Sequence, residues 1–216
     1  MTRTPRRDKT APLTYEEQAH AQGYQRVAGL DESGRGPWAG PLVAAAVILP
    51  DVDTLPDQLK GARDSKQMTH RQRLRSAEVI KQVALAYGIG VVSADDITAL
   101  GLPAALRMAY QRALDLCDIP ADFLLIDHTQ WPQQPLPHLS ITHGDQLSLS
   151  IACASILAKT WRDQHMIELH AQHPVYGFDR NKGYGTAQHS AAIQAHGIVQ
   201  GVHRLNVRPV AQARLL

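Results

Sequence analysis

Two apolar runs flank a polar, glycine-rich stretch near the start of the chain. Residues 27–30 (VAGL) and 42–49 (LVAAAVIL) are apolar, and the second run is rich in Val, Ile and Ala. Runs of this kind are typical of strands buried in a core. Between them, residues 36–40 (GPWAG) have the Gly and Pro content of a chain reversal. The pattern predicts an antiparallel pair of strands at 26–31 and 42–49.

Apolar periodicity further along the chain predicts helices that alternate with strands. Helices are expected at 14–21, 69–84, 94–100, 103–116, 147–172 and 188–196, and strands at 85–92, 123–127 and 138–142. Thr14 and Thr69 are suited to cap the first two helices. The continuously apolar run 123–127 (FLLID) indicates a central strand, parallel to one that it reaches through a helix. A loop is expected at 174–186. This order of elements predicts an α/β fold.

Four acidic residues come at or just after the ends of predicted strands. Asp31 and Glu32 end the first strand, Asp127 ends the strand 123–127, and Asp145 follows the strand 138–142. Open α/β sheets place their sites at such ends, so these side chains are expected to converge. Oxygen ligands without His or Cys spacing select Mg²⁺ or Mn²⁺. Two such ions can activate water and stabilise the leaving oxygen in phosphodiester cleavage.

The fourth acid has competing interpretations. Asp145 precedes the longest predicted helix and would also serve as its N-cap. Asp163 is a rival for the fourth place, but it lies several turns down that helix. An ordinary pair between Lys159 and Asp163 is the favoured interpretation of that residue.

Composition limits the class of protein. The chain has 216 residues, of which 44% are hydrophobic and 19% charged, which suits one domain with a large core. No stretch has the length of an apolar membrane span, and the basic, polar start lacks the apolar region of a secretory signal. The two cysteines, Cys117 and Cys153, lack metal-ligand spacing. We therefore expect a cytoplasmic protein with both thiols buried, without membrane contact.

Charge is unevenly distributed although the net charge is only +2. Residues 60–81 contain seven Lys or Arg residues and two acidic residues. Residues 157–216 contain seven Lys or Arg residues and three acidic residues. Basic surface around an acidic centre suits a polyanion that is handled with metal ions. Solvated helix faces would give the same counts.

Other catalytic motifs are missing from the sequence. It contains no phosphate-binding G-x-x-x-x-G-K-[ST], no G-x-S-x-G and no H-E-x-x-H. His189, His196 and His203 are spaced by seven residues. Gly197 is expected to end the helix before His203, so these histidines are not predicted to share a ligand face.

Several sequence blocks together resemble ribonuclease HII, the type 2 ribonuclease H of bacteria. They run in the family's order from about Val27 to Arg204. The blocks are GLDESGRGPWAGPLVAAAVIL, ARDSK, LLID, GDQLSLSIACASILAKTWRD, YGFDRNKGYGT and HGIVQGVHR. The combination is far more specific than any single block.

The resemblance implies a fold and an activity. The fold would be a ribonuclease H-like mixed five-stranded sheet flanked by helices, with a helical C-terminal part. We expect a tail and short helix at 1–25, a catalytic domain at 26–172, and a substrate-contacting loop, helix and tail at 173–216. The activity would be cleavage of RNA in RNA–DNA hybrids, and on the 5′ side of ribonucleotides embedded in duplex DNA. It would leave 3′-hydroxyl and 5′-phosphate ends. The cofactor would be Mn²⁺ or Mg²⁺, with two ions bound when substrate is present. The protein is expected to be a monomer.

The resemblance also implies residue roles. The metal-binding catalytic acids would be Asp31, Glu32, Asp127 and Asp145, which favours Asp145 over Asp163. The backbone of Gly34, Arg35 and Gly36 would contact the ribose 2′-hydroxyl. Tyr184 would stack on the adjoining deoxyribose, and Ser65 and Lys66 would hold backbone phosphate. Taken singly, Arg35 could be a turn residue, Tyr184 a core aromatic and Lys66 plain surface.

Some positions depart from the family pattern. His128 stands where glycine is common, and His143 and Leu147 stand where lysines are often found. The motif HR is followed by Leu205 rather than Ser or Thr. These changes could weaken substrate binding or alter the metal preference, but the four acids are retained. We therefore expect an active enzyme.

Two other functions and one partner are compatible with parts of the sequence. A recombinase-type nuclease on the same fold would share the acids but not the GRG and KGYGT motifs. A hybrid-binding protein without turnover would need a damaged set of acids, which the sequence does not show. The apolar end of residues 208–216 could dock on a sliding clamp, although a solvated tail is favoured.

Overall fold

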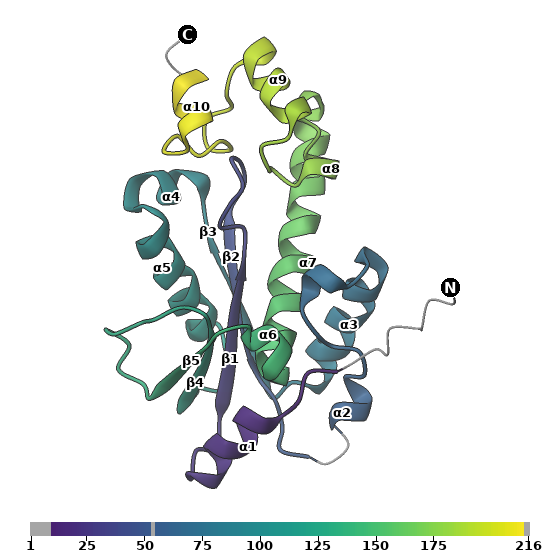
Figure 1. Ribbon diagram of the computed structural model, residues 1–216, viewed down its shortest axis with the longest axis vertical. Coiled ribbons are helices and arrows are strands. Elements are labelled where there is room, and N and C mark those ends of the chain that lie inside the picture. Colours follow the sequence, from purple (N-terminus) through teal and green to yellow (C-terminus); the bar gives the residue numbers. More distant parts are fainter. Residues whose placement is uncertain (1–9, 53–54, 214–216) are drawn as a thin grey trace, which may run out of the picture.

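A five-stranded sheet lies at the centre of the molecule, with helices on both faces (Figure 1). The computed structural model describes residues 10–52 and 55–213, except the side chains of Pro56 and Ala213. The strands are β1 (Val27–Ser33), β2 (Leu42–Ile48), β3 (Ala86–Val92), β4 (Phe123–Asp127) and β5 (His138–Ile141). Their order is β3-β2-β1-β4-β5. The first three strands are antiparallel, and β1, β4 and β5 are parallel. The mixed five-stranded sheet is thus confirmed.

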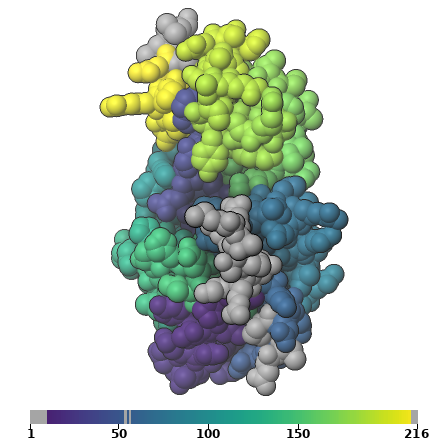
Figure 2. All heavy atoms as spheres, turned by 45° about the vertical axis from the view of Figure 1, so that its right-hand side comes forward, coloured from purple at the N-terminus to yellow at the C-terminus, as the bar shows by residue number. Residues whose placement is uncertain are grey.

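The helices pack on the two faces of the sheet and beyond one end of it. They are α1 (Thr14–Ala21), α2 (Leu55–Gln58), η1 (Ser65–Gln67), α3 (His70–Val83), α4 (Ala94–Leu100), α5 (Leu102–Asp115), α6 (Gly144–Leu147), α7 (Leu149–Gln172), η2 (Pro174–Tyr176), α8 (Phe178–Asn181), α9 (Ala187–His196) and α10 (Arg208–Ala213). Helices α3 and α7 lie on one face and α5 on the other (Figure 1). In the space-filling view, the C-terminal segment forms one end of the molecule and α1 the other (Figure 2).

Strand β2 is buried on both faces, as its continuous apolar pattern predicts. Val43 and Val47 belong to the core shared with α3 and α7, whereas Ala44 and Ala46 belong to the core shared with α5. Because successive side chains point to opposite faces, one strand supplies both layers. None of the described helices has the length and apolar character that crossing a membrane would require.

Helix α7 approaches the sheet closely at Gly29. A Cβ atom on Gly29 would lie 2.2 Å from the backbone carbon of Ser150 and 2.3 Å from the backbone nitrogen of Ile151. Only glycine permits this contact between two backbones. The N-terminal half of α7 is therefore seated directly on β1, the strand that carries Asp31 and Glu32.

The predicted helix at 147–172 is wrong at its start. Ser148 is extended, with φ −135° and ψ 127°, and separates α6 from α7. The Ser148 hydroxyl accepts the N–H of Ile151 as the N-cap of α7 and donates to Glu16 Oε1 at 2.6 Å. Glu16 also accepts the N–H of Ser150 at 2.8 Å. A buried carboxylate from α1 thus satisfies the start of α7, which local periodicity could not reveal.

Three smaller expectations are corrected. Leu13, not Thr14, occupies the N-cap position of α1 and makes no side-chain cap, whereas Thr69 caps α3 in a capping box. The loop expected at 174–186 contains η2 and α8. Cys153 is buried as expected, but Cys117 is only partly buried.

The close contact at Gly29 gives a stability prediction. Gly29→Ala should lower the free energy of unfolding by about 3 kcal/mol or more, because the added methyl group must separate α7 from β1. Gly23→Ala is the comparison, since Gly23 has φ +97° but open space around it. It should cost only about 1 kcal/mol of backbone strain. Urea unfolding of both variants measures the difference, and equal costs would contradict the packing argument.

Candidate active site

Three elements bring four predicted acids to one edge of the sheet. Asp31 and Glu32 lie near the end of β1, and Asp127 is the last residue of β4. These strands are parallel and pair Leu30 with Ile126, so Asp31 and Asp127 leave neighbouring strands at the same edge. The N–H of Gly144 donates to Asp127 Oδ1 at 2.8 Å, which anchors the start of α6 and its Asp145 beside β4.

The acids are close enough to disturb one another's ionisation. Asp31 is only 5% exposed, and burial, Glu32 and Asp127 raise its pKa well above the usual value. Burial, followed by the charges of Asp64 and Asp127, raises the pKa of Asp145 to about 6. Such buried, mutually repelling carboxylates are a frequent mark of a functional site.

Asp64 is a fifth acid at this edge that the sequence analysis missed. Its side chain accepts the N–H of Lys66 at 2.9 Å and caps η1. Its hydrogen bond with Asp145 contributes to the raised pKa of Asp145. Asp64 begins the DSK motif, but only Ser65 and Lys66 of that motif were given roles. The acidic cluster below means Asp31, Glu32, Asp64, Asp127 and Asp145.

The two other residues of the DSK motif differ in orientation. Lys66 is exposed; burial lowers its pKa, but the charges of Asp31, Asp64, Asp145 and Asp127 outweigh this and raise it. Its ammonium group therefore lies within the field of the acidic cluster. Ser65 is buried, and its hydroxyl accepts a hydrogen bond from Ser155 of α7 at 2.9 Å. Ser155 also hydrogen bonds to Asp31, a contact that no sequence motif indicated.

Glu32 is held by two side chains on opposite sides. The hydroxyl of Tyr110, on α5, donates to Glu32 Oε2, and Arg35 Nη1 lies 3.3 Å from Glu32 Oε1. Burial and the neighbouring carboxylates raise the pKa of Tyr110 well above its usual value, so the phenol remains a donor. The sequence analysis missed Tyr110 because it lies within an apolar helix face.

The glycine loop, residues 34–41, joins the acidic cluster to Tyr184. Gly34 has φ +106°, and a Cβ on it would lie 2.5 Å from Arg162 Nε, so glycine is required there. A Cβ on Gly36 would lie 3.6 Å from a ring carbon of Tyr184. Tyr184 is 46% exposed, so it is not a core aromatic. The structure therefore brings the predicted Gly34-Arg35-Gly36 and Tyr184 together.

Asp163 belongs to a separate ionic network. It is 2% exposed and lies 3.0 Å from Arg73 Nη2 and 2.5 Å from Lys159 Nζ. Both of its oxygens are thus used by cations from α3 and α7. The interpretation of Asp163 as one member of a Lys159–Asp163 pair is confirmed, with Arg73 as an additional partner.

Comparison with known proteins gives the family. The family description "Ribonuclease HII" matches residues 28–209, which include the acidic cluster, the glycine loop and Tyr184. The chain belongs to the ribonuclease HII family. It is therefore an enzyme of the ribonuclease H type, an endonuclease that acts on RNA–DNA hybrids.

Individual relatives agree with this assignment. The chain is 45% identical over 205 residues to a ribonuclease HII of Syntrophotalea carbinolica, covering 95% of this chain and 96% of that one. The fold is similar to that of ribonuclease H2 from Pyrococcus horikoshii OT3, with a TM-score of 0.75, 21% identity, and coverage of 88% and 97%. Another similar structure is a PCNA:RNase HII complex from Archaeoglobus fulgidus, with a TM-score of 0.71, 24% identity, and coverage of 87% and 96%. A third is Bst-RNase HIII in complex with Mn²⁺, with a TM-score of 0.66, 17% identity, and coverage of 91% and 71%.

Two departures from the ribonuclease HII pattern occupy left-handed backbone positions. His128 has φ 47° and His143 has φ 57°. Glycine adopts this conformation readily, which explains why it suits position 128, and histidine is among the side chains that tolerate it. The N–H of His128 donates to Ile141 at 3.0 Å, so the turn after Asp127 forms despite the substitution. Leu147, the third departure, is exposed.

The acidic cluster suits a hard divalent ion, as expected for this family. Its donors are carboxylate oxygens, and a cation would relieve the repulsion that raises the pKa values of Asp31 and Asp145. Across residues 10–52 and 55–213, however, no three His, Cys, Asp or Glu side chains already stand as a ligand set.

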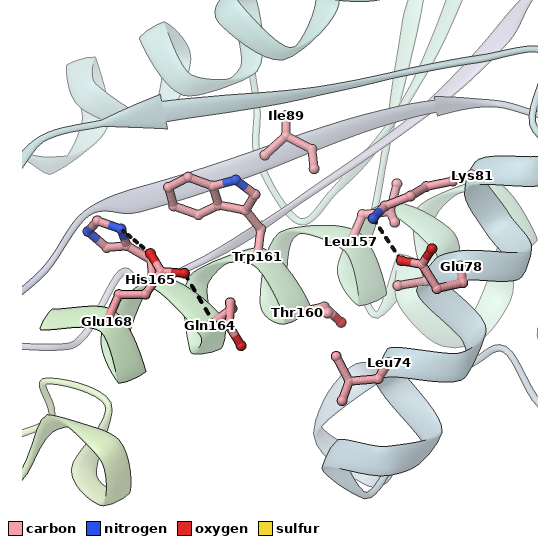
Figure 3. Close-up of a pocket in the computed structure, with 11 residues that line it drawn as sticks. Leu74, Glu78, Lys81, Ile89, Leu157, Thr160, Trp161, Gln164, His165 and Glu168 are labelled. Atoms are coloured by element: carbon pink, nitrogen blue, oxygen red, sulfur yellow. Dashed lines mark hydrogen bonds and ion pairs between the residues drawn. The ribbon is translucent and has the colours of Figure 1, made fainter. Parts of the chain in front are cut away.

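A groove between α3 and α7 contains none of these acids (Figure 3). It has a volume of about 290 Å³, and Leu74, Leu157 and Trp161 form part of its wall. Its ionisable side chains lie beside one another: Glu78 is 2.9 Å from Lys81, and Glu168 is 3.9 Å from His165. The groove is therefore not assigned to the nuclease site.

Paired substitutions test the fourth acid. Asp145→Asn should reduce cleavage of an RNA–DNA hybrid by about 10³-fold, because it removes charge beside Asp127. Asp163→Asn should leave the cleavage rate within about threefold and instead lower stability by about 3 kcal/mol, since Arg73 and Lys159 lose their counter-charge. Initial rates and urea unfolding measure the two effects. The reverse pattern would assign the fourth place to Asp163.

The raised pKa of Asp145 predicts a pH-dependent response to metal. The pKa of Asp145 is about 6 in the folded protein and 3.8 in an unperturbed carboxyl, so metal-free protein should lose stability as pH rises between these values. A divalent ion replaces the lost proton. Mn²⁺ should thus raise Tm more at about pH 7.5 than at about pH 5 in thermal unfolding, and Asp145→Asn should reduce that difference. Equal shifts at both pH values would contradict it.

Proposed function

We propose that this enzyme cleaves on the 5′ side of ribonucleotides embedded in duplex DNA, as well as RNA in hybrids. The products would be 3′-hydroxyl and 5′-phosphate ends. The observation that carries the proposal is the position of the glycine loop between the acidic cluster and Tyr184: Arg35 bonds to Glu32, and a Cβ on Gly36 would lie 3.6 Å from the Tyr184 ring. A loop that admits close backbone approach and an exposed aromatic ring lie next to the acids. That arrangement suits recognition of one ribose followed by a deoxyribose.

The acids would hold two divalent ions when substrate is bound, with Asp31, Glu32, Asp127 and Asp145 as ligands. Bound ions would activate water and stabilise the leaving 3′ oxygen. The Mn²⁺ complex of the similar ribonuclease HIII supports the use of such ions. Asp64 would orient Asp145 through their hydrogen bond, and Tyr110 would orient Glu32.

The remaining residues would bind and orient the nucleic acid. Lys66 is the exposed cation nearest in sequence to Asp64 and would hold a backbone phosphate beside the acids. Ser65 would contribute through its backbone, since its hydroxyl already binds Ser155. Gly34, Arg35 and Gly36 would present backbone groups to the 2′-hydroxyl, and Tyr184 would stack on the next sugar.

The expectations of a monomer and of a cytoplasmic location stay predictions. A sliding-clamp contact is also a prediction, supported by the PCNA complex of the related archaeal protein. The segment considered for it begins in α10, and its last residues, 214–216, lie outside the described residues. The basic N-terminal tail, 1–9, lies outside them as well.

Asp127→Asn separates catalysis from binding. Cleavage of a duplex with one ribonucleotide should fall by about 10³-fold, because a ligand charge is lost, while binding should persist because the glycine loop and Tyr184 are unchanged. The control is Asp51→Asn, because Asp51 is exposed, and this substitution should leave the cleavage rate and the binding affinity unchanged. Rates and dissociation constants are measured with Mg²⁺ and with Mn²⁺. Wild-type protein that cuts hybrids but leaves the single-ribonucleotide duplex intact with both ions would falsify the proposal. Cutting of all-DNA duplexes would favour the recombinase-type alternative.

A further inference from the structure

Arg204, from the HR motif, is buried directly beneath the glycine loop. It is 1% exposed, and within the described residues its guanidinium donates only to backbone carbonyls of that loop. Its Nε lies 2.9 Å from the oxygen of Gly40, its Nη2 lies 3.0 Å from that of Pro41, and its Nη1 lies 3.3 Å from that of Arg35. One planar guanidinium thus fixes three carbonyls at both ends of the loop.

A second buried arginine supports the same loop from α7. Arg162 is fully buried and donates to Pro41 at 3.0 Å and to Ala39 at 3.1 Å. Within the described part of the chain, no carboxylate forms an ion pair with Arg162 or Arg204. Burying two unpaired cations is costly. A loop held for stability alone could be held by neutral donors, so the cost points to a functional requirement.

The hydrogen bond to Arg35 sets the direction of the next backbone donor. In a trans peptide, the C=O of one residue and the N–H of the next point in opposite directions. Because Arg204 holds the Arg35 carbonyl toward the interior, the N–H of Gly36 points away from the buried guanidinium. A Cβ on Gly36 would lie 3.6 Å from a ring carbon of Tyr184. The orientation of this peptide plane therefore decides which backbone group faces a bound sugar.

The residue before Arg204 reaches the other substrate element. The N–H of Val199 donates to His203 Nδ1 at 2.9 Å, which makes His203 Nε2 the donor to His189 Nε2 at 3.2 Å. His189 Nδ1 then donates to the carbonyl of Tyr184 at 3.0 Å. Both rings are completely buried. This chain of bonds ties the backbone of Tyr184 to the segment that carries Arg204.

We propose that His203 and Arg204 form one positioning element for ribose recognition. Arg204 sets the peptide planes of the glycine loop, and His203, through His189, sets the backbone of Tyr184. The two residues touch neither the substrate nor the acidic cluster. They fix the distance between the group that contacts the 2′-hydroxyl and the ring that stacks on the next sugar. This inference rests on the proposed function, since it assigns a role to the same loop and ring.

Arg204→Lys tests the proposal because lysine keeps the charge but not the planar fork of donors. We measure kcat/KM on a duplex with one ribonucleotide, and the inhibition constant of the matching all-DNA duplex as competitor. We expect kcat/KM to fall by about 10²-fold, as for other small misplacements of a binding group, while the inhibition constant changes by less than about threefold. Arg208→Lys is the control, since Arg208 is exposed in the same C-terminal segment, and should change neither value.

Chemical rescue distinguishes positioning from general support of the fold. Guanidinium ion added to Arg204→Ala should restore kcat/KM by about tenfold or more, whereas methylammonium should not, because only guanidinium offers the planar fork. Equal losses in kcat/KM and in all-DNA binding, without rescue, would overturn the proposal.

Two further outcomes are also decisive. If Arg204→Lys does not fold, His203→Gln is measured in the same way. Equal losses in kcat/KM on the single-ribonucleotide duplex and in binding of the all-DNA duplex then overturn the proposal. If wild-type protein cuts hybrids but not the single-ribonucleotide duplex, the proposed function fails. The Arg204→Lys comparison is then made on the hybrid, where loss of kcat/KM with unchanged all-DNA binding still supports positioning.

Discussion

The parallel pairing of β1 with β4 brings distant parts of the chain to one place. Because Leu30 lies opposite Ile126, the strands deliver Asp31 and Asp127 to the same edge, although 96 residues separate them. The turn after β4 and the bond from Gly144 to Asp127 then place α6 and Asp145 there. On the face of β1 that also carries Asp31, Gly29 lets α7 sit against the strand. A shift in this one pairing would disperse the acids and unseat the longest helix.

The same arrangement makes the metal-free site a source of strain. Five carboxylates share one edge, and the pKa values of Asp31 and Asp145 show that they resist ionising together. Hydrogen bonds reduce the free-energy cost of this repulsion without removing it. Ser155 hydrogen bonds to Asp31, and Tyr110 and Arg35 hydrogen bond to Glu32. Stability is thus given up at the edge of the sheet where charge is needed. The dense packing of β2 and its flanking helices compensates.

The sequence was informative wherever function follows from strand ends. The strand pair, the central strand and the acids all came from local patterns, because apolar runs and the residues that end them are local features. Local patterns did not predict the roles of Asp64, Tyr110 and Ser155, because these roles depend on contacts between distant elements. The break between α6 and α7 at Ser148 was not predicted for the same reason. Glu16, on the distant helix α1, accepts the hydrogen bonds of the Ser148 hydroxyl and the Ser150 N–H. The resemblance to ribonuclease HII supplied residue roles that periodicity alone could not.

The backbone contact between the glycine loop and the C-terminal segment limits how the enzyme can move. The N–H groups of Trp38 and Ala39 both donate to the carbonyl of Gly183, and the N–H of Arg204 donates to that of Trp38. A Cβ on Gly185 would lie 2.0 Å from the Trp38 ring, so the two segments pack together with no space for a side chain at position 185. If the enzyme cleaves at embedded ribonucleotides as proposed, this tight packing would favour adjustment of the duplex over movement between the two protein segments. Deformability of the nucleic acid at the ribonucleotide would thereby contribute to selectivity, independently of any direct contact with the 2′-hydroxyl.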